Sequence, residues 1–243
     1  MTISNNDLKK YSSLNRKIKR KEHQLFVVEG EKICKELLKN DFEFESIFAT
    51  EDLQNKFPLS TVCSKKEIAR ISHLKSPSNV VAICKIPTYK INKEDKKPLI
   101  FLDNVNDPGN LGTIIRTLDW FGYNQLFCSK NTVDCFNNKA VMASMGSILR
   151  VNCHYIDFDE FQQLFPKHIT FGTSLFGKNI GTVKLKTKSI IVIGNESNGV
   201  SKDIIAKLDN TIKIPGNGKA ESLNVSVATG IVLNELGKFN PQM

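Results

Sequence analysis

The chain has 243 residues, 40% of them hydrophobic and 24% charged, which is typical of a soluble globular protein with one large domain or two ordinary ones. No window approaches the roughly 18 consecutive apolar residues of a membrane-spanning helix, and the basic N-terminus lacks the apolar core of a secretory signal. The net charge of +9 is concentrated in residues 1–97, where 20 Lys or Arg accompany 13 Asp or Glu. This excess attracts a polyanion such as RNA, although a solvated lysine-rich surface without a partner has the same composition.

The first 88 residues are predicted to form a small α/β domain. Residues 9–21 contain seven basic residues and no acidic one, which is typical of either a helix face or a flexible arm. After them, strands are expected at 24–30, 44–50, 59–64 and 79–87, and helices at 31–40 and 65–74. Residues 89–98 are charged, have no apolar period and end in proline, so we predict a linker there.

A second α/β domain is predicted for residues 99–243. Near-continuous apolar strands such as IIVIG favour a parallel, doubly wound sheet with a ligand at the carboxyl ends of its strands. The expected strands are 99–105, 125–129, 151–156, 169–175, 189–195 and 210–215, and the expected helices are 111–122, 138–149, 158–165 and 201–209. An apolar-rich helix follows near the end of the chain.

The cysteines and histidines do not form a recognisable site. No two of the six cysteines make a C-x-x-C pair, so neither a disulfide framework nor a structural zinc is expected. The four histidines lie in unrelated sequence contexts. We therefore expect a cytoplasmic protein with reduced thiols and no metal ion.

The first of three polar loops follows the strand at 99–105. Its Asp-Pro-Gly-Asn sequence, residues 107–110, is typical of a tight turn. Arg116 follows on the next helix among apolar neighbours. An arginine in such surroundings is expected to meet a phosphate or carboxylate, although a snorkelling or salt-bridged arginine is the plainer interpretation.

Two more glycine-containing loops follow later strands. In the second, IVIGNESNGVS, Gly194 permits close backbone approach, but the pattern is not the G-x-G-x-x-G of dinucleotide sites. In the third, Pro215 ends a strand, and Ser222 or Asn224 can cap the next helix. Each loop alone is explained by a turn or a cap. Together with Arg116 and Glu196 they indicate a site that transfers a group from a reactive cofactor, because no histidine or thiol nucleophile accompanies them.

These motifs resemble a known family. DPGNLGTIIRT, VIGNESNGVS and IKIPGNGKAESLNVSVATG are similar, in order and spacing, to the three motifs of the SpoU/TrmH family of RNA ribose 2'-O-methyltransferases. The resemblance covers residues 99–236, and QLFVVEGEKICKELL, residues 24–38, resembles a substrate-binding domain related to ribosomal protein L30e. The resemblance implies an L30e-like domain followed by a SPOUT-type parallel sheet with a C-terminal trefoil knot. It also implies S-adenosylmethionine as cofactor, structured tRNA or rRNA as substrate, and a homodimer.

The resemblance also implies roles for individual residues. The catalytic residues would be Arg116, Asn110, Glu196, Ser222 and Asn224, and the cofactor would be held near Gly194, Ile214, Leu223 and Asn224. Because a guanidinium is effectively always protonated, we expect Arg116 to stabilise the developing alkoxide and orient phosphate rather than abstract a proton. RNA is expected to dock on the basic N-terminal residues Arg16, Lys17, Lys19, Arg20 and Lys21.

One position departs from the family pattern. Members often have Met after the Ile-Pro of the third motif, where this chain has Gly216. Because the following residues 221–224 are intact, we expect cofactor binding with an altered pocket rim. Two alternatives were weighed against methyl transfer. A non-catalytic RNA-binding protein on the same scaffold is disfavoured by the presence of Arg116, Glu196 and Asn224, and a nicotinamide-dependent oxidoreductase by the missing dinucleotide motif.

Overall fold

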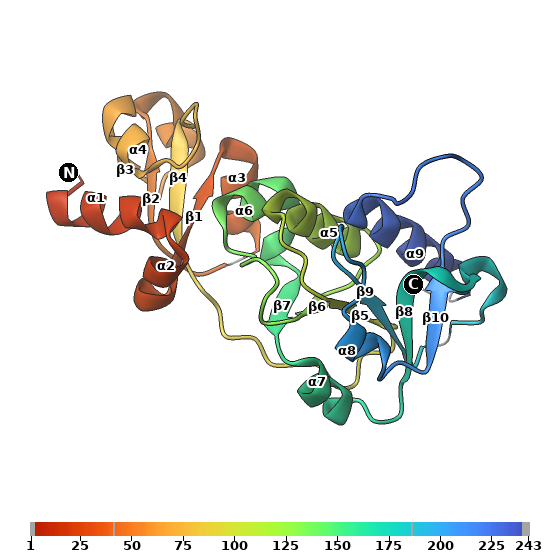
Figure 1. The fold of residues 1–243 in the computed structure, drawn as a ribbon. Helices are drawn as coiled ribbons and strands as arrows, with labels where there is room; N and C mark the ends of the chain where they lie inside the picture. The colour runs from red at the N-terminus through yellow and green to blue at the C-terminus, as the bar shows by residue number, and fades with distance from the viewer. Residues whose placement is uncertain (1–2, 41, 186, 240–243) are drawn as a thin grey trace. The chain divides into compact units, whose positions relative to one another are not determined.

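The computed structural model describes residues 3–40, 42–185 and 187–239 (Figure 1). The chain divides into two compact units, residues 1–88 with 134–149, and residues 89–133 with 150–243. Within the described residues, no helix combines the length and apolar character needed to cross a bilayer.

The first unit is built on a four-stranded mixed sheet in the order β1-β4-β2-β3. β4 is antiparallel to both β1 and β2, and β2 is parallel to β3. Helices flank the sheet because each presents an apolar face to it, as with the buried Ile33, Cys34 and Leu37. The elements are α1 (Asn5–Ser12), η1 (Ser13–Asn15), α2 (Lys17–His23), β1 (Leu25–Glu29), α3 (Glu31–Lys39), β2 (Phe44–Ala49), η2 (Glu51–Lys56), β3 (Thr61–Val62), α4 (Lys65–Ile71), β4 (Val80–Lys85), α6 (Asn138–Ser144) and η3 (Ser147–Leu149).

The basic N-terminal segment is helical rather than a flexible arm. Leu8, Tyr11 and Leu14 are buried in the core of the first unit, which explains why α1 and the short η1 helix are held against it. Arg20 is also buried, with 3% of its surface exposed, and its guanidinium forms an ion pair with Asp134 at 2.6 Å.

The burial of Arg20 changes its expected role. Its guanidinium also donates to the backbone oxygens of Leu14 and Asn15, at 2.8 and 3.0 Å, so its donors are directed into the protein. A buried and paired arginine holds its segment in place and is not available to a phosphate backbone. Arg20 is therefore a structural residue, and the expectation that it faces RNA is corrected.

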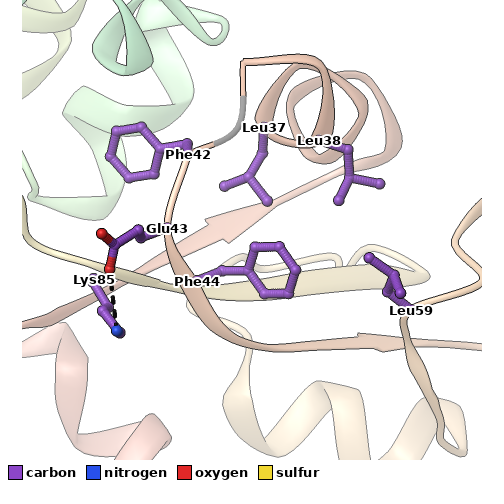
Figure 2. A pocket seen from close by; sticks show the side chains of 7 residues that line it. All are labelled: Leu37, Leu38, Phe42, Glu43, Phe44, Leu59 and Lys85. Carbon is purple, nitrogen blue, oxygen red and sulfur yellow. Dashed lines mark hydrogen bonds and ion pairs between the residues drawn. The ribbon is translucent and has the colours of Figure 1, made fainter.

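A hollow of about 390 Å³ opens on the first unit (Figure 2). Figure 2 shows the rings of Phe42 and Phe44 beside leucine side chains, with the Lys85–Glu43 ion pair at its margin. The hollow is lined by Leu37, Leu38, Phe42, Glu43, Phe44, Leu59 and Lys85. None of the residues expected to perform chemistry lines this hollow.

The second unit is a six-stranded sheet, entirely parallel, in the order β10-β8-β9-β5-β6-β7. In Figure 1, α5 and α9 cover one face of this sheet, and α7 and α8 lie on the other. The predicted parallel sheet with two covered faces is thus confirmed. The elements are β5 (Leu99–Leu102), α5 (Pro108–Trp120), β6 (Gln125–Cys128), β7 (Asn152–Tyr155), α7 (Phe158–Leu164), β8 (Ile169–Asn179), η4 (Ile180–Thr182), β9 (Ser189–Ile193), α8 (Lys202–Ile205), β10 (Asn210–Lys213) and α9 (Val225–Phe239).

The segment predicted as a linker is attached to the second unit. The Gln125 side chain accepts from the Asn92 backbone N–H at 3.2 Å and donates to the Asn92 oxygen at 3.0 Å. Its amide also donates to Asp95 at 3.0 Å. These side-chain to backbone bonds order a charged segment that has no apolar period of its own.

The stability of the second unit is expected to fall at acidic pH through His154. This side chain is 8% exposed, its Nε2 has no hydrogen-bond partner, and its ring stacks on Phe127 with 5.3 Å between centroids. Burial lowers the pKa of His154 below its usual value of 6.5, because the charged ring would lose its hydration. Below that pH the unfolded chain binds a proton that the folded chain does not, so stability falls as pH falls.

Urea unfolding at pH 7.5 and 5.5 measures this effect. The wild type should lose free energy of unfolding at the lower pH, and a His154→Phe variant should lose less. Burial also lowers the pKa values of His73 and His168. The His154→Phe variant should therefore keep part of the pH dependence of stability. An equal loss in both proteins would contradict the assignment to His154.

Candidate active site

The three predicted loops leave the same edge of the second sheet. All six strands are parallel, so the loops that follow β5, β9 and β10 emerge at their carboxyl ends. β9 lies between β5 and β8, and β8 separates it from β10. Residues 103–107, 194–201 and 214–224 are thus brought to one region from distant parts of the sequence.

Asn110 joins all three loops. Its Nδ2 donates to Glu196 Oε1 at 2.7 Å, and its Oδ1 accepts from Asn224 Nδ2 at 2.9 Å. A carboxylate can only accept, which fixes the orientation of the Asn110 amide. Asn224 Oδ1 in turn accepts from the Ser226 backbone N–H at 2.9 Å, so Asn224 is also the N-cap of α9. The three predicted residues Asn110, Glu196 and Asn224 form one hydrogen-bonded chain.

A second network, which the sequence analysis missed, supports the first two loops. Asp103 is 2% exposed and accepts from the Ser201 backbone N–H at 2.7 Å and from Asn104 Nδ2 at 2.8 Å. Asn195 Nδ2 donates to the Asn104 oxygen at 2.8 Å, and Asn104 has a left-handed backbone with φ of 56°. An acidic residue directly after a buried strand was the available sequence signal.

Gly194 occupies a position that only glycine fits. The turn after it folds back through reciprocal backbone bonds between Asn195 and Gly199, both at 2.9 Å. A Cβ on Gly194 would lie 2.0 Å from the Gly199 carbonyl carbon and 2.1 Å from the Val200 nitrogen. This contact is backbone against backbone, so no side-chain rotation relieves it.

Arg116 and Ser222 lie apart from this hydrogen-bonded chain. Arg116 follows Asn110 by six residues on α5, about 9 Å along the helix axis. Its side chain is exposed and, among the described residues, makes no hydrogen bond or ion pair. The described residues thus provide no carboxylate partner for Arg116, and a phosphate of a bound ligand remains the expected one. Ser222 is also exposed and is not the cap of α9.

Figure 1 shows a long loop between β10 and α9. Over the described residues 216–223, no backbone N–H donates a hydrogen bond within the chain. Ile214 is half-buried at the start of this loop, and Leu223 is 46% exposed at its end. Free N–H groups beside apolar side chains fit a nucleoside-containing cofactor, which needs both polar and apolar contacts.

The described part of the site has no thiol nucleophile. The three loops contain no cysteine, and Cys128, on the neighbouring strand β6, is buried, which disfavours its thiolate. Over the described ranges, no group of three or more His, Cys, Asp or Glu side chains could hold a metal ion. What the site offers is a fixed carboxylate, oriented amides and backbone N–H groups without partners among the described residues, with an exposed guanidinium about two turns further along α5, which suits positioning rather than covalent catalysis.

The comparisons with known proteins place the chain in a family. The model described as the SpoU rRNA Methylase family matches residues 97–234, which is more than half of the chain. The chain belongs to the SpoU rRNA methylase family. A second model, the MRM3-like substrate binding domain, matches residues 5–82.

Relatives of this SpoU family member cover both units. A Bacillus subtilis (strain 168) protein named 23S rRNA (guanosine(2553)-2'-O)-methyltransferase RlmP is 30% identical over 247 residues, covering 97% of each chain. A TrmH-family structure from Porphyromonas gingivalis has a TM-score of 0.86 at 28% identity and covers 99% of each chain. An AdoMet-bound rRNA methyltransferase from Sinorhizobium meliloti has a TM-score of 0.86 at 27% identity, covering 99% of this chain and 98% of that one.

Proposed function

We propose that this SpoU family member methylates a ribose 2'-hydroxyl of structured tRNA or rRNA, with S-adenosylmethionine as the methyl donor. The observation that carries the proposal is the chain Glu196–Asn110–Asn224, which joins the three family motifs at one edge of a parallel sheet. The names of full-length relatives support it, since one is a 23S rRNA 2'-O-methyltransferase and another was solved with AdoMet bound. The non-catalytic alternative has no such support.

The cofactor is proposed to bind against the loops that follow β9 and β10. Gly194 permits close approach of the backbone, and Ile214 and Leu223 supply apolar contacts near the unused N–H groups of the third loop. Asn224, directly before α9, is proposed to contact the cofactor as well. When bound, S-adenosylmethionine supplies an electrophilic methyl group, so the protein needs no metal ion to activate it.

The protein's own residues are proposed to orient the ribose and stabilise its charge. Arg116 provides a permanent positive charge that would stabilise the negative charge developing on O2' as the hydroxyl proton passes to water, and its guanidinium can contact the adjacent phosphate. Asn110 holds Glu196 and Asn224 in fixed positions, and these two, with Ser222, contact the substrate or cofactor. By positioning the ribose beside the bound cofactor, these groups would lower the entropic cost of methyl transfer, which is a large part of the rate gain in such reactions.

RNA docking is proposed for the exposed part of the basic N-terminal segment. Arg16, Lys17 and Lys21 are exposed, and Lys19 is partly exposed and paired with Glu22. Arg20 is left out because it is buried against Asp134. Lysine and arginine side chains on such a surface bind phosphate without reading base sequence.

Finer features of the family are also proposed for this chain. The L30e-like character of the first domain, residues 1–88, follows from the resemblance, and the linker at 89–98 is proposed from its charged composition without an apolar period. The resemblance also supports the trefoil knot in the domain 99–243, for which the long loop between β10 and α9 is the natural element. We also propose a cytoplasmic location, where RNA is available and the six cysteine thiols stay reduced.

A homodimer is proposed through α5 and α9. Trp120 on α5 is 85% exposed, and Val227 and Leu223, on and just before α9, are 51% and 46% exposed. The two helices pack closely, since a Cβ on Gly230 would lie 3.8 Å from Thr117. Exposed apolar side chains on adjacent helices favour association, because they become buried at the interface with a second copy of the chain.

Replacement of Trp120 is expected to separate the dimer. A Trp120→Asp variant places a charge at the centre of the proposed interface and should weaken association about a hundredfold or more. Analytical ultracentrifugation should give twice 27.3 kDa for the wild type and 27.3 kDa for the variant. Leu59→Asp, at a 68% exposed position in the first unit, is the matched control and should remain a dimer. A monomeric wild type would contradict the proposal.

The activity is tested by transfer of labelled methyl from S-adenosylmethionine to total cellular RNA, separated afterwards into tRNA and rRNA. Label in one fraction supports the reaction and selects the substrate class. Absence of label together with absence of cofactor binding would refute the proposal.

A further inference from the structure

β8 carries an exposed aromatic side chain at the same edge of the sheet as the three loops. Phe176 is 94% exposed and its neighbour Leu175 is 64% exposed. Single exposed apolar side chains are common, but two adjacent ones form a small apolar patch, and such patches mark sites of interaction. None of the three family motifs includes this segment.

The segment is a bulge on the strand between two of the three loops. β8 pairs with β10 at Gly172↔Thr211 and next at Lys178↔Ile212, so the five residues 173–177 project from the ladder. β8 lies between β9 and β10, and the bulge follows its buried first part. The bulge therefore emerges between the loops that carry Gly194 and Asn224.

The bulge is held at both ends. The Phe176 backbone N–H donates to Ser174 Oγ at 3.2 Å, which closes a local turn. Gly177 packs directly on β10, because a Cβ there would lie 2.5 Å from the Ile212 nitrogen. An anchored backbone fixes the direction of an exposed ring and reduces the entropy that a binding partner must overcome.

The charge around the bulge favours a polyanion. Between Glu160 and Glu196 the sequence contains five lysines and no acidic residue. Lys178 follows the bulge directly, and Lys213 is on β10 opposite Asn179; both lysines are exposed. An aromatic face with flanking lysines is the combination by which proteins bind unpaired nucleotides, with stacking on the base and charge on the phosphates.

We propose that Phe176 stacks on an unpaired nucleobase of the substrate RNA, next to the ribose that is methylated. This inference rests on the proposed function and adds a positioning residue to it. Lys178 and Lys213 would contact the flanking phosphates. Base stacking on an aromatic side chain contributes about 1–3 kcal/mol per base, which corresponds to roughly 5- to 150-fold in affinity.

The test compares kcat/KM for RNA among variants of one position. Phe176→Ala and Phe176→Leu should each lower kcat/KM roughly 5- to 150-fold through a raised KM, with the Kd for S-adenosylmethionine unchanged. Phe176→Trp keeps an aromatic face and should stay near the wild type. Ile169→Ala removes a 48% exposed side chain at the opposite end of β8 and is the matched control.

A binding measurement separates this proposal from the proposed function. Trp120 is the single tryptophan, so Phe176→Trp combined with Trp120→Phe places the only tryptophan on the bulge. Its fluorescence should be quenched by substrate RNA and not by S-adenosylmethionine alone, whether or not turnover occurs. The stacking proposal is overturned if RNA leaves the fluorescence unchanged, if Phe176→Leu matches the wild type, or if only cofactor affinity falls. Quenching by RNA in the Phe176→Trp, Trp120→Phe variant, together with a wild type that transfers no methyl, would refute the proposed function alone.

Discussion

Replacing Arg116 by alanine is expected to abolish methyl transfer while the fold is retained. The side chain is exposed and has no partner within the described chain, so its loss leaves no buried group unpaired. Its proposed role is to stabilise charge on O2' in the transition state, and removal of one such group costs about 10²- to 10³-fold in kcat. Steady-state methyl transfer to the accepting RNA fraction measures the effect.

The controls for Arg116 distinguish a catalytic from a structural effect. Arg116→Ala should keep the wild-type Tm and the wild-type Kd for S-adenosylmethionine. Arg116→Lys keeps the positive charge without the planar fork, so it should retain more activity than alanine if the role is electrostatic. Activity of Arg116→Ala within about threefold of the wild type would contradict the assigned role.

The Gly194→Ala variant is expected to lose both stability and activity. The added methyl group would lie 2.0 to 2.3 Å from backbone atoms of Gly199 and Val200, and the turn must move to admit it. Overpacking of this kind costs about 1–3 kcal/mol, which lowers Tm by roughly 2–12 °C in a chain of this size. Displacement of the turn carries Glu196 away from Asn110, so methyl transfer should fall about a hundredfold or more.

Thermal unfolding and cofactor titration measure the Gly194→Ala effects, and Gly237→Ala is the matched control. A Cβ on Gly237, in α9, has no heavy atom within 4 Å, and alanine is the better helix former. That variant should keep or slightly raise the Tm. A Gly194→Ala variant with the same Tm and the same Kd for S-adenosylmethionine as Gly237→Ala would contradict the close backbone contact at Gly194.

Most helices and strands were predictable because their signals are local. The expected strand at 189–195 is β9 (Ser189–Ile193), and the expected helix at 31–40 is α3 (Glu31–Lys39). The bulge of β8 was not predictable, since it depends on pairing with β10, about 40 residues away. Residues 134–149 group with the first unit through contacts such as the Arg20–Asp134 ion pair and the Phe26–Phe136 ring contact, which no sequence pattern indicates.

The sequence motifs named candidate site residues but could not indicate the hydrogen bonds among them. The motifs identified Asn110, Glu196 and Asn224, but only the parallel topology explains why residues up to 114 positions apart exchange hydrogen bonds. The apolar neighbours of Arg116 suggested an internal partner, whereas the helix directs this side chain outward. The supporting pair Asp103 and Asn195 was missed because a single polar residue after a strand is common.

The most direct test of the central claim is the chemical position of the transferred methyl group. RNA labelled by the wild-type protein and S-adenosylmethionine is hydrolysed in alkali, which cleaves only where a free 2'-hydroxyl adjoins the phosphate. We predict label in alkali-resistant dinucleotides, formed at least about a hundredfold more slowly by Arg116→Ala. Label released in mononucleotides would show base methylation and contradict a ribose 2'-O-methyltransferase.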